Sequence, residues 1–380
     1  MLNKIKFVRI AIPILLLSFI LGGWGNVGHR IINGNTVNSF PQNFKQFSIW
    51  KDSLANHGSD ADYRKSADPT EAPKHYIDFE DYNDFVTKGT VIQDYDSAVA
   101  KYGLYAITDA GSLPWTIMQC YDTLITAFKQ REWHHVVLLS ADLGHYIGDA
   151  NMPLHLTKNY DGQYTSQKGI HSRYESTMIS QYSSLIPIHQ NEAVYLSNVQ
   201  DYIFSMTYQN YPYVDSVLRA DSIAYAASSK NYKSTVYSQT LWNLTKNFTG
   251  ILFSRSAEVL ASVMYTAWIN AGSPPLSPTF VEEVKNSAFG FLLEQNYPNP
   301  FNPSTTIKYS VPKNINNQSL IINLKVYDAL GREVATLVNE QKEPEFYKVE
   351  WNATNVASGI YFYRIQAGDF IQTKRLILLR

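Results

Sequence analysis

The hydrophobic pattern of the chain changes once along its length. Up to about residue 272 the apolar positions recur at helical spacing. In residues 251–270 they form a stripe of Ile251, Leu252, Val259, Leu260, Val263, Met264, Ala267 and Trp268. Residues 133–149 and 112–131 show similar spacing, and Pro114 lies early in the latter segment, where a helix tolerates it. Alternation typical of strands is scarce here, so we expect an all-α domain over residues 24–272.

After a proline- and serine-rich segment at 273–278 the pattern becomes strand-like. Short runs rich in β-branched and aromatic residues are separated by turn-forming residues at 328–331, 352–355 and 367–369. The expected strands are 320–327, 333–338, 347–351, 359–366 and 370–379. Strands at such regular spacing predict a small all-β sandwich. We therefore expect a linker at 273–290 and a β domain at 291–380.

The first 23 residues have the pattern of a secretory signal peptide. Lys4, Lys6 and Arg9 precede an apolar stretch, residues 10–21, which ends at Gly22-Gly23. The stretch is shorter than the ~20 residues of a membrane-spanning helix. No cysteine follows it directly, which argues against a lipoprotein anchor. Cleavage after Gly23 would make Trp24 the new N-terminus of an exported protein.

Composition restricts the chemistry that the chain can perform. Lys+Arg 32 against Asp+Glu 33 gives a net charge of -1, and without a polybasic run this excludes a dedicated binder of duplex DNA. A hydrophobic content of 45% argues against a disordered chain. The single cysteine, Cys120, excludes an internal disulfide and a zinc site built on several thiolates. Any metal must therefore be held by His, Asp, Glu or the main chain.

Two pairs of such residues have the spacing of ligands on one helical face. His145 and Asp149 are four residues apart, and so are His171 and Glu175. Each pair alone is compatible with an ordinary surface pair, and single histidines such as His29 are compatible with ordinary polar positions. The further candidate ligands are His29, Asp60, Asp62, His75 and His155.

Taken together and in order, these residues resemble the trinuclear zinc family. Its branches are the bacterial zinc-dependent phospholipases C and the fungal single-strand-specific nucleases. The positions that carry the resemblance are Trp24, His29, Asp60, His75, His145, Asp149, His155, His171 and Glu175. It covers residues 24–272 and implies the helical fold of that family and a zinc-dependent hydrolase of phosphodiester bonds.

The resemblance also implies how three zinc ions would be held. The first ion would take Asp60, His75, His145 and Asp149, and the second would take His155, His171 and Glu175. The third would take the main chain of Trp24, His29 and a bridging oxygen of Asp149. Either Asp60 or Asp62 can match the family aspartate, and the Asp-x-Asp pattern with its separation from His75 favours Asp60.

The implied reaction is attack on phosphorus by a water that zinc activates. Asp60 would be the catalytic residue that orients or deprotonates this water, as well as a ligand. No side-chain nucleophile is needed, which leaves Cys120 as a core residue. Because the family binds zinc through the free α-amine of its N-terminal tryptophan, an uncleaved precursor is expected to be inactive or poorly metallated.

The substrate is open between a phospholipid headgroup and a single-stranded nucleic acid. Glutamate, here Glu175, is the residue type that the phospholipase branch has at this position. The amino-acid sequence of residues 168–175 is also more similar to that branch. The nuclease branch commonly carries disulfides, which Cys120 alone cannot form. The sequence therefore favours a phospholipase C-like enzyme, with a single-strand-specific nuclease as the alternative. A non-catalytic surface protein with structural zinc is a further alternative.

The tail resembles the C-terminal sorting domain of bacterial type IX secretion cargo. The matching motifs are Asn296-Tyr297-Pro298-Asn299-Pro300-Phe301-Asn302-Pro303, Val326 to Val334, and Ser358-Gly359-Ile360-Tyr361-Phe362. The resemblance covers residues 291–380 and implies type IX secretion machinery as partner. The expected location is outside the cell or on its surface, reached through the periplasm and outer membrane. No obligate protein partner is inferred for the catalytic domain.

Overall fold

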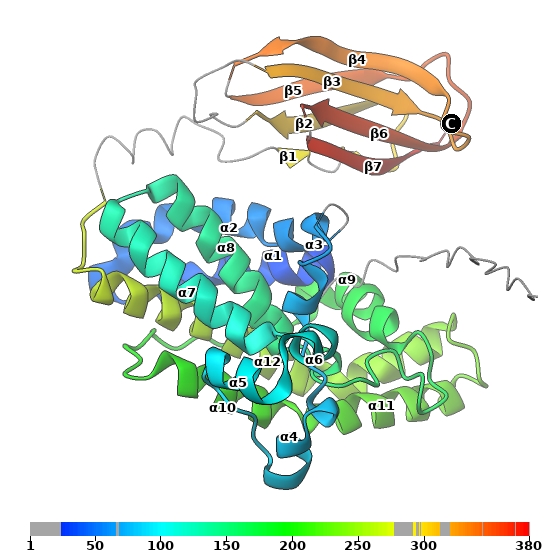
Figure 1. Cartoon of the computed structure of the whole chain (residues 1–380). Coiled ribbons are helices and arrows are strands. Elements are labelled where there is room, and N and C mark those ends of the chain that lie inside the picture. The colour runs from blue at the N-terminus through cyan, green and yellow to red at the C-terminus, as the bar shows by residue number, and fades with distance from the viewer. Residues whose placement is uncertain are drawn as a thin grey trace, which may run out of the picture.

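A computed structural model describes residues 24–65, 68–276, 292–293, 296, 298–311, 320–343, 345–368 and 370–379. The expected signal peptide, residues 1–23, lies outside the described residues, as do residues 277–290 of the expected linker. The expected order of an all-α part followed by an all-β part is confirmed (Figure 1).

The helical part runs from Gly25 to Asn270. Its elements are α1 (Gly25–Asn35), η1 (Thr36–Ser39), η2 (Gln42–Trp50), α2 (Lys51–His57), α3 (Asp60–Arg64), η3 (Ala72–His75), η4 (Phe79–Asp81), α4 (Asn83–Lys88), α5 (Tyr95–Tyr102), α6 (Leu104–Ala110), α7 (Leu113–Gln130), α8 (Trp133–Ala150), η5 (Pro153–His155), η6 (Ser172–Met178), α9 (Ile179–Tyr182), η7 (Ser183–Leu185), α10 (Val199–Asn210), α11 (Tyr213–Ala227) and α12 (Thr235–Asn270). Three of them, α7, α8 and α12, correspond to the helices expected from the apolar stripes. Within the described ranges, no helix has both the length and the apolar character needed to cross a membrane.

The long helix α12 connects two hydrophobic cores. Its C-terminal half packs with α7 and α8 in one core, and its N-terminal half packs with α11 and the π-helix η6 in another. The side-chain amide of buried Asn33 on α1 donates to the carbonyl oxygens of Leu54 (3.2 Å) and Ala141 (3.0 Å). Since α8 is covered by α1, α2, α7 and α12, the polar residues near its end are enclosed by the core.

The β part is a sandwich of two antiparallel sheets, as expected. Its strands are β1 (Leu292–Leu293), β2 (Ser304–Ser310), β3 (Leu320–Tyr327), β4 (Glu333–Lys342), β5 (Phe346–Asn352), β6 (Gly359–Ala367) and β7 (Phe370–Leu378). One sheet has the order β1-β2-β5 and the other β4-β3-β6-β7, and apolar residues of both sheets form one core. The short strand β1 and strand β2 were not among the expected strands.

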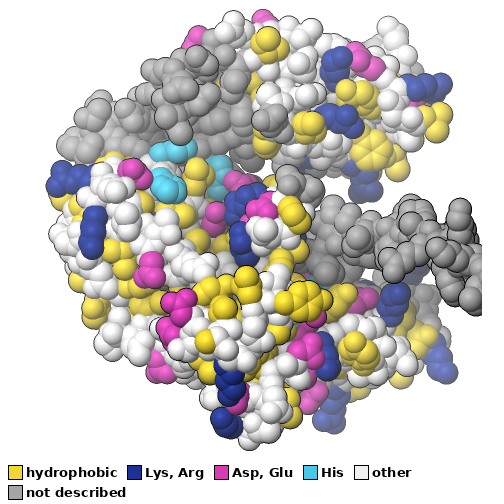
Figure 2. Space-filling model, viewed as in Figure 1, with side chains coloured by type: hydrophobic (Ala, Val, Ile, Leu, Met, Phe, Trp, Pro, Cys, Tyr) yellow, Lys and Arg dark blue, Asp and Glu magenta, His cyan; other side chains and the backbone are white. Residues whose placement is uncertain are grey.

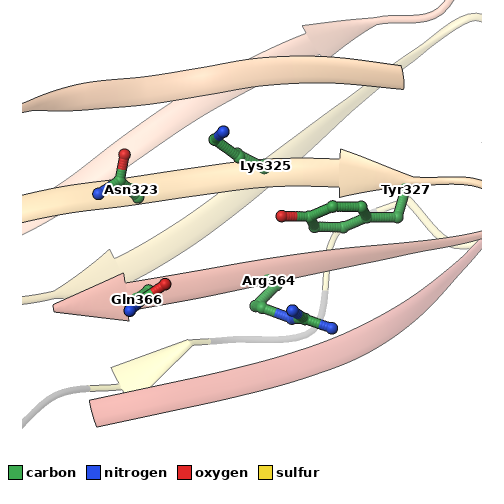
Figure 3. Close-up of a pocket in the computed structure, with 5 residues that line it drawn as sticks. All are labelled: Asn323, Lys325, Tyr327, Arg364 and Gln366. Atoms are coloured by element: carbon green, nitrogen blue, oxygen red, sulfur yellow. The ribbon is translucent and has the colours of Figure 1, made fainter. Parts of the chain in front are cut away.

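The outer face of the four-stranded sheet is polar because successive residues of a strand point to opposite faces. Residues 322, 324 and 326 of β3 are buried, whereas Asn323, Lys325 and Tyr327 lie on the outside with Arg364 and Gln366 of β6. Figure 3 shows these five side chains around a shallow hollow. None of these five residues is a histidine or a carboxylate, so the hollow lacks the usual side-chain ligands of a metal ion.

Candidate metal centre

Three groups of buried metal-ligating side chains lie in the helical part. The His29 group consists of His29, His145 and Asp149, and the Asp62 group consists of Asp62, His75 and His145. The Glu175 group consists of His155, His171 and Glu175. Within each group the potential ligand atoms all lie within 4.8 Å of one another. Because His145 belongs to two groups, the first two are parts of one cluster.

The groups form where short elements meet the C-terminal end of α8. This helix supplies His145 and Asp149 one turn apart, and α1 supplies His29. A Cβ at Gly148 of α8 would lie 3.1 Å from His29 Nδ1, so the glycine permits the close approach of α1. Trp24 Nε1 donates to the Gly148 carbonyl oxygen (2.8 Å), which fixes the start of α1 beside Asp149.

The carboxylate of Asp149 is the centre of the cluster and is wholly buried. Its Oδ2 lies 2.9 Å from His75 Nδ1 and 3.3 Å from His145 Nε2. Its Oδ1 lies 3.4 Å from His29 Nε2 and 3.6 Å from His155 Nδ1. The two oxygens thus face histidines of the His29 group and of the Asp62 group, which is the arrangement needed for a ligand that bridges these two groups.

Main-chain carbonyl groups orient two of the imidazole rings. His145 Nδ1 donates to the Gly58 carbonyl oxygen (2.8 Å), and His155 Nδ1 donates to the His75 carbonyl oxygen (2.6 Å). A carbonyl oxygen only accepts, so each Nδ1 carries a proton, and Nε2 is the nitrogen that can bind metal once it is deprotonated. Both Nε2 atoms face their groups, as metal binding requires.

Glu71 contacts His75 of the Asp62 group on the side of the ring that faces away from Asp149. The sequence analysis did not identify this residue. Its Oε1 lies 3.4 Å from His75 Nε2 and accepts from the Tyr146 hydroxyl (2.5 Å), while Oε2 accepts from Lys74 (2.8 Å). Burial would raise the pKa of Glu71, but the nearby His75 imidazole and hydrogen bonds from Lys74 and Tyr146 hold it well below its usual range. The carboxylate therefore stays charged and turns His75 Nδ1 toward Asp149.

The centre contains several buried polar atoms that lack hydrogen-bond partners. They are His29 Nδ1 and Nε2, His75 Nε2, Asp149 Oδ1, His171 Nδ1 and Glu175 Oε2. An unpartnered polar atom in the interior costs free energy, and a bound cation removes this cost for the atoms that it coordinates. The residues present therefore fit a metal centre.

Without metal, the cluster is held together by protons shared between imidazoles and carboxylates. Burial would lower the pKa of His145, but Asp149 and Asp62 raise it to about 10. Burial would raise the pKa of Asp149, but His145 and His155 hold it well below its usual range. A protonated imidazole nitrogen cannot bind metal, so metal uptake must release protons and weaken at acid pH.

Asp62, and not Asp60, faces the cluster. Asp62 Oδ1 lies 3.7 Å from His75 Nδ1 and 3.5 Å from His145 Nε2. Asp60 Oδ2 instead lies 2.6 Å from His57 Nδ1, and its side chain is 40% exposed. Both residues are on α3, where positions two apart point roughly 200° away from each other, so only one can face α8. The structure thus places Asp62, and not the expected Asp60, beside the ligand groups, while the roles of metal ligand and catalytic residue stay predictions.

The Glu175 group lies at the start of a π-helix rather than an ordinary helical turn. His171 directly precedes η6, and Glu175 lies within it. His171 Nε2 is 2.7 Å from Glu175 Oε2 and 3.0 Å from His155 Nε2. The wider i→i+5 turn keeps both side chains on one side of the helix, and π-helical turns are frequent at functional sites.

Two residues that lie near the cluster, Lys65 and Asp78, were not indicated by any pattern in the sequence. Lys65 Nζ donates to Asp62 Oδ1 (2.7 Å), which places a cation beside the Asp62 group. Asp78 follows Ile77, whose N–H donates to the His155 carbonyl oxygen (2.8 Å). Burial, together with Asp81 and Glu80, raises the pKa of Asp78 to about 7. Neither residue has a characteristic spacing, so only the tertiary structure identifies them.

Other expected residues are placed as follows. Trp24 is buried as the N-cap of α1, one turn before His29. The three groups consist of side chains alone, so main-chain ligation by Trp24 stays a prediction. Burial raises the pKa of the Cys120 thiol to about 12, which agrees with its having no role as a nucleophile.

Comparison with known proteins identifies the tail. Residues 295–379 match the family described as the secretion system C-terminal sorting domain, which confirms the resemblance of this part and indicates type IX export to the cell surface or beyond. No curated protein sequence is significantly similar to the chain.

Solved structures with some similarity include two clostridial toxins. The alpha toxin from Clostridium absonum has 9% identity and a TM-score of 0.42, with 95% of this chain and 97% of that chain covered. The alpha-toxin of Clostridium perfringens from avian strain SWCP has 9% identity and a TM-score of 0.44, with 94% and 98% covered. Both superpositions are loose, and neither bears on the activity of this chain.

The two neighbouring aspartates provide a matched pair of variants. Asp62→Asn should lower the zinc content of the purified protein, because it removes a carboxylate from the Asp62 group. Asp60→Asn should leave the zinc content unchanged, since Asp60 lies against His57. Elemental analysis after dialysis against a weak chelator measures both. Loss of zinc from the Asp60 variant alone would contradict this placement.

The raised pKa of Asp78 predicts how stability changes with pH in metal-free protein. Because the folded state holds this proton up to pH about 7 while the unfolded chain loses it near 3.8, stability falls as pH rises between these values. Asp78→Asn removes this dependence. The difference in free energy of unfolding, variant minus wild type, should therefore rise by about 1–2 kcal/mol between pH 5 and pH 8. This range allows for the partial exposure of Asp78.

Urea unfolding in excess chelator at the two pH values measures this difference. The exposed Asp96→Asn is a control for removal of a carboxylate, and its difference from wild type should change little with pH. An Asp78 variant that behaved like the control would show that the carboxyl group ionises normally in the folded protein.

Proposed function

We propose that the chain is an exported zinc-dependent hydrolase of phosphodiester bonds, of the phospholipase C type. The observation that carries this proposal is the set of three buried ligand groups around the single carboxylate of Asp149. A structural site needs one closed set of ligands, whereas adjoining groups with only three side chains each leave positions open for water and substrate.

The donor types support zinc as the metal. The three groups contain only imidazole and carboxylate donors, and this combination suits zinc. Three ions are proposed, one for each group, with Asp149 as the shared carboxylate and the Trp24 main chain completing the His29 group. When bound, zinc supplies a water activated at neutral pH and offsets the charge of the phosphate oxygens.

The residues of the chain have separate roles in this proposal. Asp62 takes the place expected for Asp60 and accepts a hydrogen bond from the attacking water, which orients it. The Lys65 ammonium group, held by Asp62 at 2.7 Å, attracts a non-bridging oxygen of the phosphate. The buried imidazoles of His145 and His155 stay fixed by their carbonyl partners, so the site needs little rearrangement to bind substrate.

A phospholipid is the substrate that the observations favour. The last ligand is Glu175, the residue type of the phospholipase branch. On the face in view in Figure 2, Lys and Arg side chains are interspersed with Asp and Glu and form no broad basic surface among the coloured residues. A nucleic acid binder depends strongly on such a surface, and the net charge is only -1.

The proposal is tested with mature protein that starts at Trp24 and lacks the sorting domain. Phosphatidylcholine and single-stranded DNA are offered side by side, with and without a chelator. We expect hydrolysis of the lipid, abolished by the chelator and restored by zinc. His145→Ala should lower activity at least about 100-fold, because it removes a buried imidazole ligand from the part of the centre where two groups adjoin.

The matched control is His135→Ala. His135 is exposed, contacts Glu132 on the surface and belongs to none of the groups, so activity should not change. Cleavage of DNA alone would replace the lipid substrate with a nucleic acid. Normal zinc content without hydrolysis of either substrate would support the non-catalytic alternative.

Processing of the N-terminus should control metal loading. A chain that retains Gly23 ahead of Trp24 has an amide nitrogen there, whose lone pair is delocalised and does not bind zinc as an amine does. We expect this form to bind less zinc and to be less active than the form that begins at Trp24. Equal zinc content and activity in the two forms would rule out ligation by the Trp24 amine.

A further inference from the structure

Within the metal centre, His171 is held differently from His145 and His155. His145 and His155 each donate Nδ1–H to a main-chain carbonyl group, but His171 Nδ1 is buried without a hydrogen-bond partner. Outside the group, the His171 ring contacts Tyr160, at 5.8 Å between ring centroids. The position of His171 therefore depends mainly on the backbone of the helix that follows it.

Arg173 of η6 lies between His171 and Glu175 in sequence and anchors this helix. Its Nη2 donates to Asp221 Oδ1 on α11 (2.9 Å) and to the Gln167 carbonyl oxygen (3.1 Å). Its Nη1 donates to the Lys168 carbonyl oxygen (2.8 Å). One guanidinium group thus joins the π-helix to α11 and to the segment that leads into His171.

Asp221 is wholly buried and has several partners of its own. Its carboxylate accepts hydrogen bonds from Gln167 Nε2 (2.9 Å) and from the Tyr237 hydroxyl of α12. The Tyr232 ring lies 3.8 Å from the Arg173 guanidinium carbon, in cation–π contact. A buried ion pair satisfied from so many directions has little freedom to move, and it fixes one side of η6.

A second side of η6 is fixed by Tyr174. Its hydroxyl is 3.0 Å from Thr249 Oγ1 on α12, and its ring packs against Trp24 at 5.7 Å between centroids. Arg173 and Tyr174 are adjacent and point to different neighbours. Together they leave His171 and Glu175 facing His155 and the metal centre.

We infer that Asp221 and Arg173 are a positioning pair for the metal ion of the Glu175 group. Neither residue belongs to a ligand group. The pair acts by holding η6 in place, so that the ligand atoms of His171 and Glu175 lie close enough together to bind one metal ion. The inference rests on the metal centre in the proposed function, but it requires only metal binding and no particular substrate.

The test uses the mature full chain and measures zinc affinities by competition with a chromophoric chelator. Asp221→Asn removes the charge that holds Arg173. We expect one of the three zinc ions to bind about 10–100-fold more weakly and the other two to bind as in wild type. In a His171→Ala background, which already lacks a ligand of that ion, Asp221→Asn should not weaken the remaining two.

Arg173→Lys provides a second variant should Asp221→Asn fold poorly. It keeps a positive charge beside Asp221 but loses the planar fork that also reaches the Gln167 and Lys168 carbonyl oxygens. We expect a smaller loss of affinity at the same single ion. After cobalt substitution, the visible absorption of that site should change in both variants.

Asp84→Asn is the matched control for the loss of a partly enclosed carboxylate. Asp84 accepts from Lys101, Tyr102 and Lys88 and belongs to none of the ligand groups. It should lower thermal stability without changing any zinc affinity. If Asp221→Asn and Arg173→Lys left all affinities unchanged, or weakened all three ions equally, the pair would be structural and the inference overturned.

These outcomes are distinct from failure of the proposed function. Wild-type protein that binds three zinc ions but hydrolyses neither substrate contradicts the enzyme and leaves the positioning pair fully testable. Wild-type protein that binds no zinc contradicts both.

Discussion

The helical domain is organised around one buried carboxylate. Asp149 lies on a helix that is enclosed by four others, and its two oxygens face histidines of the His29 group and of the Asp62 group. A charge in such a position is unfavourable unless cations or protonated groups surround it. The imidazoles meet this need in the absence of metal, and a metal centre meets it better because it also uses the lone pairs that have no hydrogen-bond partner.

The remaining polar residues of the interior follow from this constraint. The Gly58 and His75 carbonyl groups fix two imidazole rings, and Glu71 fixes a third from behind. His171 has no such partner, so its position depends on the π-helix and on the pair of Arg173 and Asp221. The histidine ligands are thus held in two different ways, by direct contacts to their rings and by anchoring of the helix backbone beside them.

The β-sandwich and the helical domain have independent cores. Among the described residues, the sandwich core runs from Leu293 to Leu378, and residues 295–379 match a secretion sorting domain. The five side chains that line the hollow on its outer sheet face include no histidine and no carboxylate. The separation is physically reasonable, because an address for export has to work whatever cargo precedes it. Chemistry and export are therefore assigned to different parts of one chain.

The sequence by itself determined the order of the helical and β parts and most of the residues in the ligand groups. Apolar periodicity is a local property, and helical spacing alone brings His145 to Asp149 and His171 to Glu175. The sequence did not identify β2, which follows the bend at Asn302-Pro303. It also did not indicate that η6 is a π-helix.

Only the tertiary structure decided between Asp60 and Asp62, because the choice depends on how the short helix α3 is rotated against α8. It alone also revealed Glu71, Lys65, Arg173 and Asp221, which have no fixed spacing from the ligands. Their roles come from contacts between distant segments, and such contacts exist only once the chain has folded.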